Sequence, residues 1–231
     1  MLAVLYDLHG NIPALDAVLE DAQAAGADRY LLGGDYAGFG AWPRETVRRL
    51  EALPDATWIA GNHERWLGGD RHDAPPGPLV GPATEAQQAA LDSDVTARLS
   101  GLPPTARIGD TLFCHASPHS DMASFGPNPE PEDRERLGTL DAGVARVVFG
   151  HTHVQLRRRG PEGVELVNPG SVGLPFDGDP RAAYARIADD GTVTLHRVDY
   201  DRSIVIAALE DRGEQWATIV AGWLRTARFA L

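Results

Sequence analysis

The histidines and aspartates of this sequence gather at five places where a short apolar run meets a glycine-containing loop. The five segments are Tyr6–Asn11, Gly33–Asp35, Gly61–Glu64, Phe113–His115 and Gly150–His153. They hold five of the eight histidines in the chain, which is more than a random placement would give. Imidazole and carboxylate groups together suit Mn, Fe, Zn or Co better than Ca or Mg. The sequence therefore predicts a transition-metal site.

The polar side chains of these segments are numerous enough for two ions. Asp7 and His9 are two residues apart after an apolar run, as are His151 and His153, so each pair would share one face of an extended strand. Strand ends in open α/β sheets converge on one crevice. Such convergence would gather seven candidate ligands, namely Asp7, His9, Asp35, Asn62, His115, His151 and His153. Seven ligands fit two ions about 3.5–4 Å apart that share a carboxylate.

A pair of divalent ions would make this site positive, even with the charges of Asp7 and Asp35 and a net charge of −12 on the chain. The site would bind a phosphoryl group and lower the pKa of a bridging water, and the hydroxide would attack phosphorus in line. The leaving alkoxide needs a proton. His63 is the candidate general acid; the alternative is that it only positions Asn62.

The elements that must hold these residues follow from apolar periodicity. Residues 2–6, 29–32 and 57–60 read as strands, with helices after Asn11 and over 43–53, an order that predicts a parallel sheet. Tight turns such as Asp190–Gly191 join the later strands and indicate an antiparallel part. We expect one α/β domain over residues 1–231 with mixed sheets. Loops 64–83 and 117–131 are candidate lids.

A helix expected over residues 213–229 carries an apolar stripe. The stripe consists of Trp216, Ile219, Val220, Trp223 and Ala227. Packing on the chain's own sheet would explain it, and the alternative is a homo-oligomer interface, where tryptophan is enriched.

Composition limits the class of protein. Of the 231 residues, 43% are apolar and 23% are charged, which is typical of a globular chain, and no apolar run is long enough to span a membrane. A single cysteine excludes an internal disulfide, and no signal peptide is recognisable, so we expect a cytoplasmic protein without membrane contact. The acidic charge opposes a nucleic-acid partner and favours a small phosphorylated substrate.

The motifs D-x-H-G-N, G-G-D, G-N-H-E, a lone histidine after a strand and G-H-T-H, in this order over residues 7–153, resemble those of the calcineurin-like metallophosphoesterases. The segments Asn168–Gly173 and Asp177–Arg181 are similar to the small bacterial members. The resemblance implies a four-layer αββα sandwich of two mixed sheets flanked by helices. Tyr6 departs from the pattern, because many members have a small residue there.

The resemblance also implies residue roles. One metal would be held by Asp7, His9, Asp35 and His153, and the other by Asp35, Asn62, His115 and His151, with Asp35 bridging. His63 would be the general acid. Small bacterial members hydrolyse phosphomonoesters, phosphodiesters or dinucleoside polyphosphates. Manganese is the first expectation for the metal, with Fe, Zn, Ni or Co as others.

Two other functions fit the same fold. A nuclease would need a basic groove, which the sequence does not indicate. A non-catalytic scaffold, as in the similar retromer subunit, would not need His63, which is present here. The remaining alternative is that the five segments are ordinary polar strand ends with no common function, but this would require five independent matches to the motif order.

Several residues near the motifs have simpler interpretations. Cys114 would point away from His115 and be a buried small hydrophobe. Glu64 reads as a helix-start or surface acid. His72 and His119 lie in the long loops and read as surface residues, although either could reach substrate. Arg157–Arg159 read as a solvated strand edge, with a nucleic-acid contact as the alternative.

Overall fold

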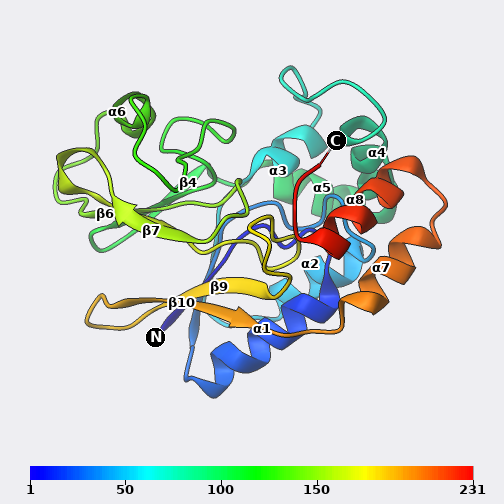
Figure 1. Cartoon of the computed structure of the whole chain (residues 1–231), viewed down its shortest axis with the longest axis horizontal. Coiled ribbons are helices and arrows are strands. Elements are labelled where there is room, and N and C mark those ends of the chain that lie inside the picture. Colours follow the sequence, from blue (N-terminus) through cyan, green and yellow to red (C-terminus); the bar gives the residue numbers. More distant parts are fainter. Residues whose placement is uncertain (231) are drawn as a thin grey trace.

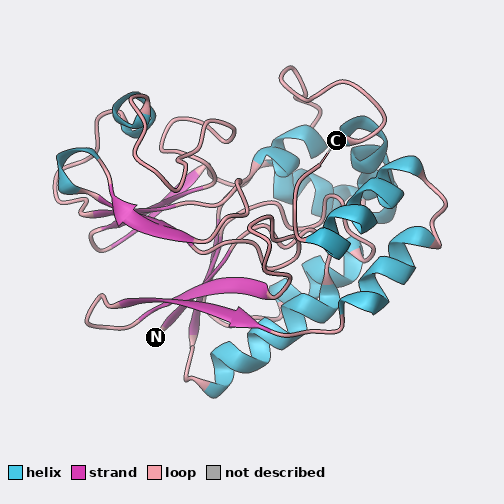
Figure 2. Cartoon of the chain, viewed as in Figure 1, coloured by secondary structure: helices cyan, strands magenta, loops and turns pink. Residues whose placement is uncertain are grey.

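The computed structural model describes residues 1–230, which form two mixed five-stranded sheets and the helices that cover them (Figures 1 and 2). The first sheet has the order β10-β9-β1-β2-β3 and the second the order β4-β5-β6-β8-β7. The strands of the first sheet are β1 (Leu2–Leu5), β2 (Arg29–Leu32), β3 (Ala56–Trp58), β9 (Ala182–Ile187) and β10 (Val193–Val198). Those of the second are β4 (Thr105–Ile108), β5 (Thr111–Cys114), β6 (Arg146–Val148), β7 (Leu156–Arg159) and β8 (Glu165–Asn168).

Each sheet has a parallel centre and antiparallel edges. Strands β1, β2 and β3 run parallel, and so do β5, β6 and β8. Strands β9 and β10 extend the first sheet in antiparallel fashion, and β4 and β7 close the second sheet in the same way. The carboxyl ends of the parallel strands in each sheet therefore meet at one edge, as the sequence predicted.

The helices are α1 (Ile12–Ala24), α2 (Pro43–Glu51), α3 (Asn62–Leu67), α4 (Val80–Ala90), α5 (Ser93–Ser100), α6 (Asp133–Leu137), α7 (Arg202–Glu210) and α8 (Gln215–Thr226), with a 3-10 turn at Pro161–Gly163. Helix α1 starts where the sequence predicts, because the Asn11 side chain accepts a hydrogen bond from the Ala14 amide at 3.1 Å.

The layers pack through separate apolar clusters. Side chains such as Val4, Leu31 and Phe113 fill the space between the two sheets. The helices α1 and α2 cover the outer face of the first sheet. The outer face of the second sheet packs against the short α6 and the surrounding loop through Phe125 and Leu137. The expected αββα order is confirmed, with a fourth layer that is mostly loop.

Two of the expected boundaries are wrong, and one helix was not expected. The loop expected over 64–83 is shorter, because α3 continues to Leu67 and α4 begins at Val80. The helix expected over 213–229 covers only Gln215–Thr226, since Glu214 is extended and Ala227 takes a left-handed conformation with φ 50°. Helix α7 was not predicted; Asp201 caps it through the Ser203 amide at 3.0 Å.

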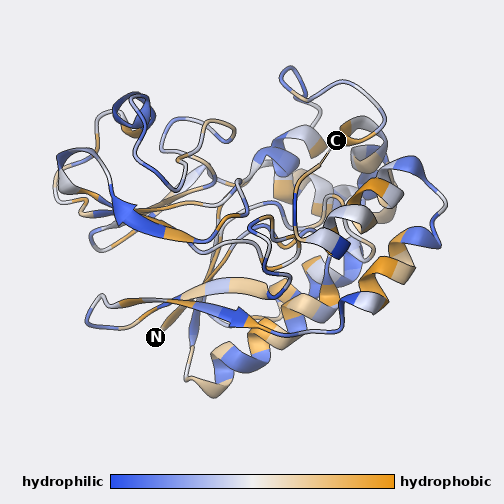
Figure 3. Ribbon diagram, viewed as in Figure 1, coloured by the Kyte–Doolittle hydropathy of each residue, from blue (hydrophilic) through white to orange (hydrophobic). Residues whose placement is uncertain are grey.

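The arginines of β7 lie on the edge of the second sheet, which is hydrophilic in Figure 3. Arg157 binds Glu165 at 2.6 Å and Arg158 binds Asp133 at 2.8 Å. The expected strand edge is confirmed. None of the helices within residues 1–230 has the length and apolar character needed to cross a membrane.

The turn after β8 comes so close to the turn after β1 that it requires a glycine. A Cβ on Gly173 would lie 1.8 Å from the Leu8 carbonyl oxygen. The Gly173 amide also donates to the Asp7 carbonyl at 3.0 Å, which ties the two turns together.

Gly173→Ala should therefore lower the free energy of unfolding by about 3 kcal/mol, because the backbone must move to relieve the overlap. Gly222→Ala is the matched control, since a Cβ there meets no atom within 4 Å. That change should stabilise α8 by up to about 1 kcal/mol. Denaturant unfolding of both variants measures the difference, and equal stabilities would contradict the packing argument.

Candidate metal centre

The predicted ligands lie at the carboxyl ends of strands from both sheets. Asp7 and His9 follow β1, and Asp35 follows β2. The remaining candidates come from three further strand ends: Asn62 and His63 begin α3 after β3, His115 follows β5, and His151 and His153 follow β6. The candidate ligands therefore come from two different β-sheets.

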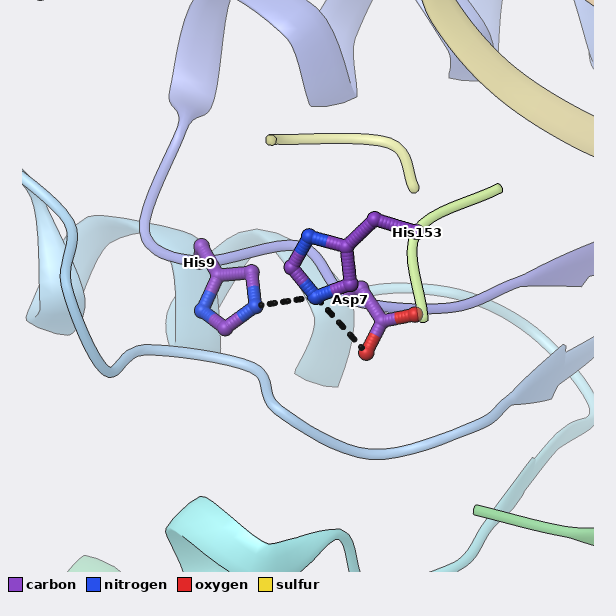
Figure 4. A group of neighbouring side chains, drawn as sticks. All are labelled: Asp7, His9 and His153. Carbon is purple, nitrogen blue, oxygen red and sulfur yellow. Dashed lines mark hydrogen bonds and ion pairs between the residues drawn. The ribbon is translucent and has the colours of Figure 1, made fainter. Parts of the chain in front are cut away.

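One group of ligand atoms surrounds Asp7, as Figure 4 shows. The buried Asp7 Oδ1 has no hydrogen-bond partner among the described residues. It lies 3.6 Å from His153 Nε2 and 3.8 Å from His115 Nε2. Asp7 Oδ2 accepts from the His151 amide at 3.0 Å. Burial raises the pKa of Asp7 well above its usual value, although the His115 charge opposes the rise.

The rings of His9 and His153 are oriented for a cation. His9 Nδ1 donates to the Gly38 carbonyl at 2.9 Å, and His153 Nδ1 donates to the Leu174 carbonyl at 2.6 Å. Because a carbonyl only accepts, both rings carry their proton on Nδ1, and the neutral ring leaves Nε2 bare. The two Nε2 atoms are 3.2 Å apart. Burial lowers the pKa of both rings, so two lone pairs face each other, an arrangement that a bound cation relieves.

A second group surrounds Asp35. Its Oδ2 lies 3.5 Å from His115 Nε2, 3.8 Å from His63 Nε2 and 3.9 Å from His9 Nε2. Burial alone would raise the pKa of Asp35, but the charge of His115 lowers it well below its usual range. Asp35 therefore contacts imidazoles from both halves of the centre.

His115 and His151 complete the second group. His115 Nδ1 donates to the Gly33 carbonyl at 2.9 Å, so its buried Nε2 faces the two carboxylates. Burial lowers the pKa of His115, but the Asp35 and Asp7 charges prevail and raise it to about 10. His151 Nδ1 lies 3.0 Å from Asn62 Oδ1, and burial lowers the pKa of His151 to about 4.

The donor set fits transition-metal ions. Three overlapping groups of carboxylate oxygens and imidazole nitrogens each lie within 4.8 Å: Asp7, His9 and His153; Asp7, Asp35 and His115; and His9, Asp35 and His63. Buried charges and bare imidazole nitrogens in this mixture are what Mn, Fe, Zn or Co ions bind. The buried Asp7 oxygen and His115 nitrogen without partners are the donors such ions would satisfy.

The expectation that each pair of candidates shares one face of an extended strand is wrong. Strand β1 ends at Leu5 and β6 at Val148, so neither the Asp7–His9 pair nor the His151–His153 pair lies on a strand. Five of the candidates have left-handed backbones: Asp7 (φ 54°), His9 (φ 46°), Asp35 (φ 55°), His151 (φ 65°) and His153 (φ 56°). Such conformations are strained outside glycine and accumulate at functional sites.

Glu64 was expected to be a helix-start or surface acid. It does lie in the first turn of α3, but it is fully buried. Its carboxylate accepts from the amides of Asp35 at 2.8 Å, Tyr36 at 3.0 Å and Gly61 at 2.9 Å. Burial, together with the Asp35 charge, raises the pKa of Glu64 to about 7. Glu64 thus fixes the backbone that presents Asp35, a role that the sequence motif did not reveal.

Tyr6 and Cys114 lie behind the centre. The Tyr6 hydroxyl donates to the Val148 carbonyl at 3.1 Å, and its ring lies where a Cβ on Gly33 or Gly150 would be. Tyr6 therefore occupies the core between the sheets instead of crowding the ligands. Cys114 is buried and unbridged, as expected, and burial raises the pKa of its thiol.

A cavity of about 730 Å³ opens over the centre and borders His63. Pro75 from one long loop and Met122 from the other also line it. His72 and His119 do not line this cavity; they border a second one of about 660 Å³ together with Arg65 and Asp121.

The comparisons with known proteins agree with this geometry. Residues 1–190 match the calcineurin-like phosphoesterase superfamily domain, so the chain belongs to this family. Phosphodiesterase YfcE of Escherichia coli is 29% identical over 184 residues, which cover 80% of this chain and 85% of that protein. The crystal structure of a metallophosphoesterase from Sphaerobacter thermophilus has 28% identity and a TM-score of 0.80 over 98% of this chain and 99% of that chain. A hypothetical protein from Pyrococcus horikoshii has a TM-score of 0.81 and 20% identity over 100% of both chains, and shares the fold.

Glu64→Ala should lower the free energy of unfolding by about 3 kcal/mol, because three buried amides lose their acceptor. The Asp35 loop should loosen, so the variant should also bind fewer manganese ions per chain by elemental analysis. Glu64→Gln keeps one oxygen acceptor and should lose less than half as much stability. Full stability and metal content in Glu64→Ala would show that the Asp35 loop keeps its conformation without Glu64.

Proposed function

We propose that this protein is a dinuclear metal-dependent phosphoesterase that hydrolyses small phosphodiesters, phosphomonoesters or dinucleoside polyphosphates. The observation that carries the proposal is the buried set of unpartnered carboxylate and imidazole atoms at the strand ends. Membership of the phosphoesterase family and the similarity to a phosphodiesterase support the reaction class.

The proposed ligand roles are those that the family resemblance implies, and the contacts around Asp7 and Asp35 support them. Asp7, His9 and His153 would hold one ion, and Asn62, His115 and His151 the other, with Asp35 shared. Asp35 suits the shared position because its Oδ2 is close to both His9 and His115. Manganese is the proposed metal, and Fe, Zn, Ni or Co have the same ligand preference.

The chemistry supplied by two bound divalent ions is Lewis-acid activation of the phosphoryl group and of the attacking water. The chain orients His9, His115 and His153 through backbone carbonyls that accept from their Nδ1 atoms. His63 would donate a proton to the leaving oxygen. Its ring is held between Phe39, at a centroid distance of 4.4 Å, and Trp66, at 4.8 Å. Burial lowers the pKa of His63 to about 3, and the Asp35 charge, 3.8 Å away, opposes this fall. To protonate the leaving oxygen, the ring must carry the extra proton of the imidazolium form when substrate is bound.

The proposed substrate is small. The net charge of −12 opposes a nucleic-acid backbone, and Arg157 and Arg158 of β7 are bound to carboxylates, which argues against a nuclease. A scaffold without catalysis would not require His63. We further propose that loops 68–79 and 117–131 close over the substrate, because both contribute to the cavity wall.

The test of this function is manganese-dependent hydrolysis of bis(p-nitrophenyl) phosphate and of diadenosine tetraphosphate, with single-stranded DNA as a control substrate. Asp35→Ala should lose both ions and all measurable activity, since Asp35 is the shared ligand. Elemental analysis gives the metal content. Two ions retained in Asp35→Ala would refute the bridging role, and an inactive, metal-loaded wild type would refute the function.

His63→Ala should retain two ions and lose about 100-fold or more in kcat, the range for removal of a general acid. His63→Gln, which keeps an N–H donor, should lose less. Metal content and kcat on the diester measure the two effects separately. Wild-type kcat in His63→Ala would exclude His63 from the reaction, and loss of a metal would assign it as a ligand.

A further inference from the structure

The segment that begins with α8 forms one wall of the cavity over the metal centre. Trp223, Arg228 and Phe229 line the same cavity as His63 and His153. The family match covers residues 1–190, so α8 and the segment after it lie outside the matched region.

Aromatic rings run without a break from the metal centre to the chain's final residues. Phe176 stacks on His153, with centroids 4.4 Å apart and planes at 16°. Phe176 and Phe229 each contact Trp223, at 5.5 Å and 4.9 Å. Phe39 connects Trp223, at 6.0 Å, with His63, at 4.4 Å. We call Phe39, Phe176, Trp223 and Phe229 the aromatic wall.

The outermost ring of the wall is exposed but held in place. Phe229 is 55% exposed, and only Ile204, at 51%, matches it among the large hydrophobic residues of the described chain. Trp223 Nε1 donates to the Ala230 carbonyl at 2.5 Å, and the Gly178 amide donates to the Ala227 carbonyl at 2.9 Å. These bonds fix the backbone on both sides of Phe229, so its exposed ring is held in position for contact with a ligand.

The wall offers π faces but few hydrogen bonds. Its one polar side-chain atom, Trp223 Nε1, already bonds to a carbonyl. Arg228 is the one arginine lining the cavity, and within residues 1–230 no carboxylate pairs with it. It lies against Gly178, where an added Cβ would be 2.9 Å from its Nη2. A polyol would find few hydrogen-bond partners on this wall. A flat aromatic ring joined to an anionic phosphoryl group could stack on the rings and pair with Arg228.

We propose that the aromatic wall is a subsite for a planar aromatic group carried by the phosphate ester, that Phe229 selects the ring and that Arg228 binds the phosphoryl anion. The proposal rests on the proposed function only for the position of the phosphoryl group at the metal centre. The stacking contact between Phe176 and the predicted ligand His153 joins the two sites directly.

The experiment compares phenylphosphonate with methylphosphonate, which cannot be hydrolysed at the P–C bond and differ in the ring. Calorimetry with the manganese-loaded protein should give a dissociation constant about tenfold lower for phenylphosphonate. Phe229→Ala should reduce this preference to less than about threefold, with methylphosphonate binding unchanged. Arg228→Gln should weaken both ligands by a similar factor and keep the preference.

Ile204→Ala is the matched control, because it removes an equally exposed apolar side chain from α7 and should keep the full preference. Cyclohexylphosphonate tests planarity and should bind more weakly than phenylphosphonate. Equal binding of the phenyl and methyl compounds by the wild type would overturn the subsite. So would an undiminished preference in Phe229→Ala, or cyclohexyl binding as tight as phenyl.

Hydrolysis of bis(p-nitrophenyl) phosphate by the same preparation separates the two proposals. Hydrolysis without a ring preference would leave the phosphoesterase standing and remove the subsite. A ring preference without hydrolysis would do the reverse.

Discussion

Two carboxylates buried among imidazoles are the constraint on which this structure depends. Asp7 and Asp35 are almost inaccessible to solvent, and a buried charge is costly unless partners surround it. The imidazoles meet this need with their Nε2 atoms, because carbonyls bind the Nδ1 atoms of His9, His115 and His153. The left-handed turns and the buried Glu64 maintain this geometry. Much of the local backbone therefore serves to hold charged groups at a place where water cannot solvate them.

Which segments form the central strands and which residues cluster could be predicted from the sequence, because apolar runs and glycine-containing loops are local signals. The backbone geometry that brings these residues together could not be predicted. Period-two alternation placed Asp7 and His9 on one face, whereas left-handed turns bring them together. These turns depend on contacts with distant segments, such as the bond from the His9 amide to the Asp35 carbonyl at 2.9 Å.

Other features were missed for related physical reasons. Helix α3 has six residues, too few to show a helical period. Glu64 accepts hydrogen bonds from three backbone amides, two of which belong to another loop, and no local sequence pattern indicates such contacts. The stripe of α8 was recognised, but its partners were not. Trp216 and Trp223 are buried among side chains of other helices of the same chain, whereas the sequence predicted packing on a sheet.

The aromatic wall adds rings from several elements to the candidate ligands. The ligands follow the strands of the two sheets, and the rings come from the loops after β2 and β8, from α8 and from the segment after α8. His153 and Phe176 lie where the two groups meet. The wall contacts the ligand rings without replacing any of them, so its residues can change without removing a ligand.

The origin of the ligands in two separate sheets has a mechanical consequence. His9 and His153 are 144 positions apart in the sequence, yet their ring nitrogens are 3.2 Å from each other. A cation shared by such residues acts as a cross-link that closes a very long loop, and closing a long loop removes more disorder from the unfolded chain than closing a short one. Resistance to heat should therefore rise and fall with the ion supplied, so that melting profiles rank the ions without any knowledge of the substrate.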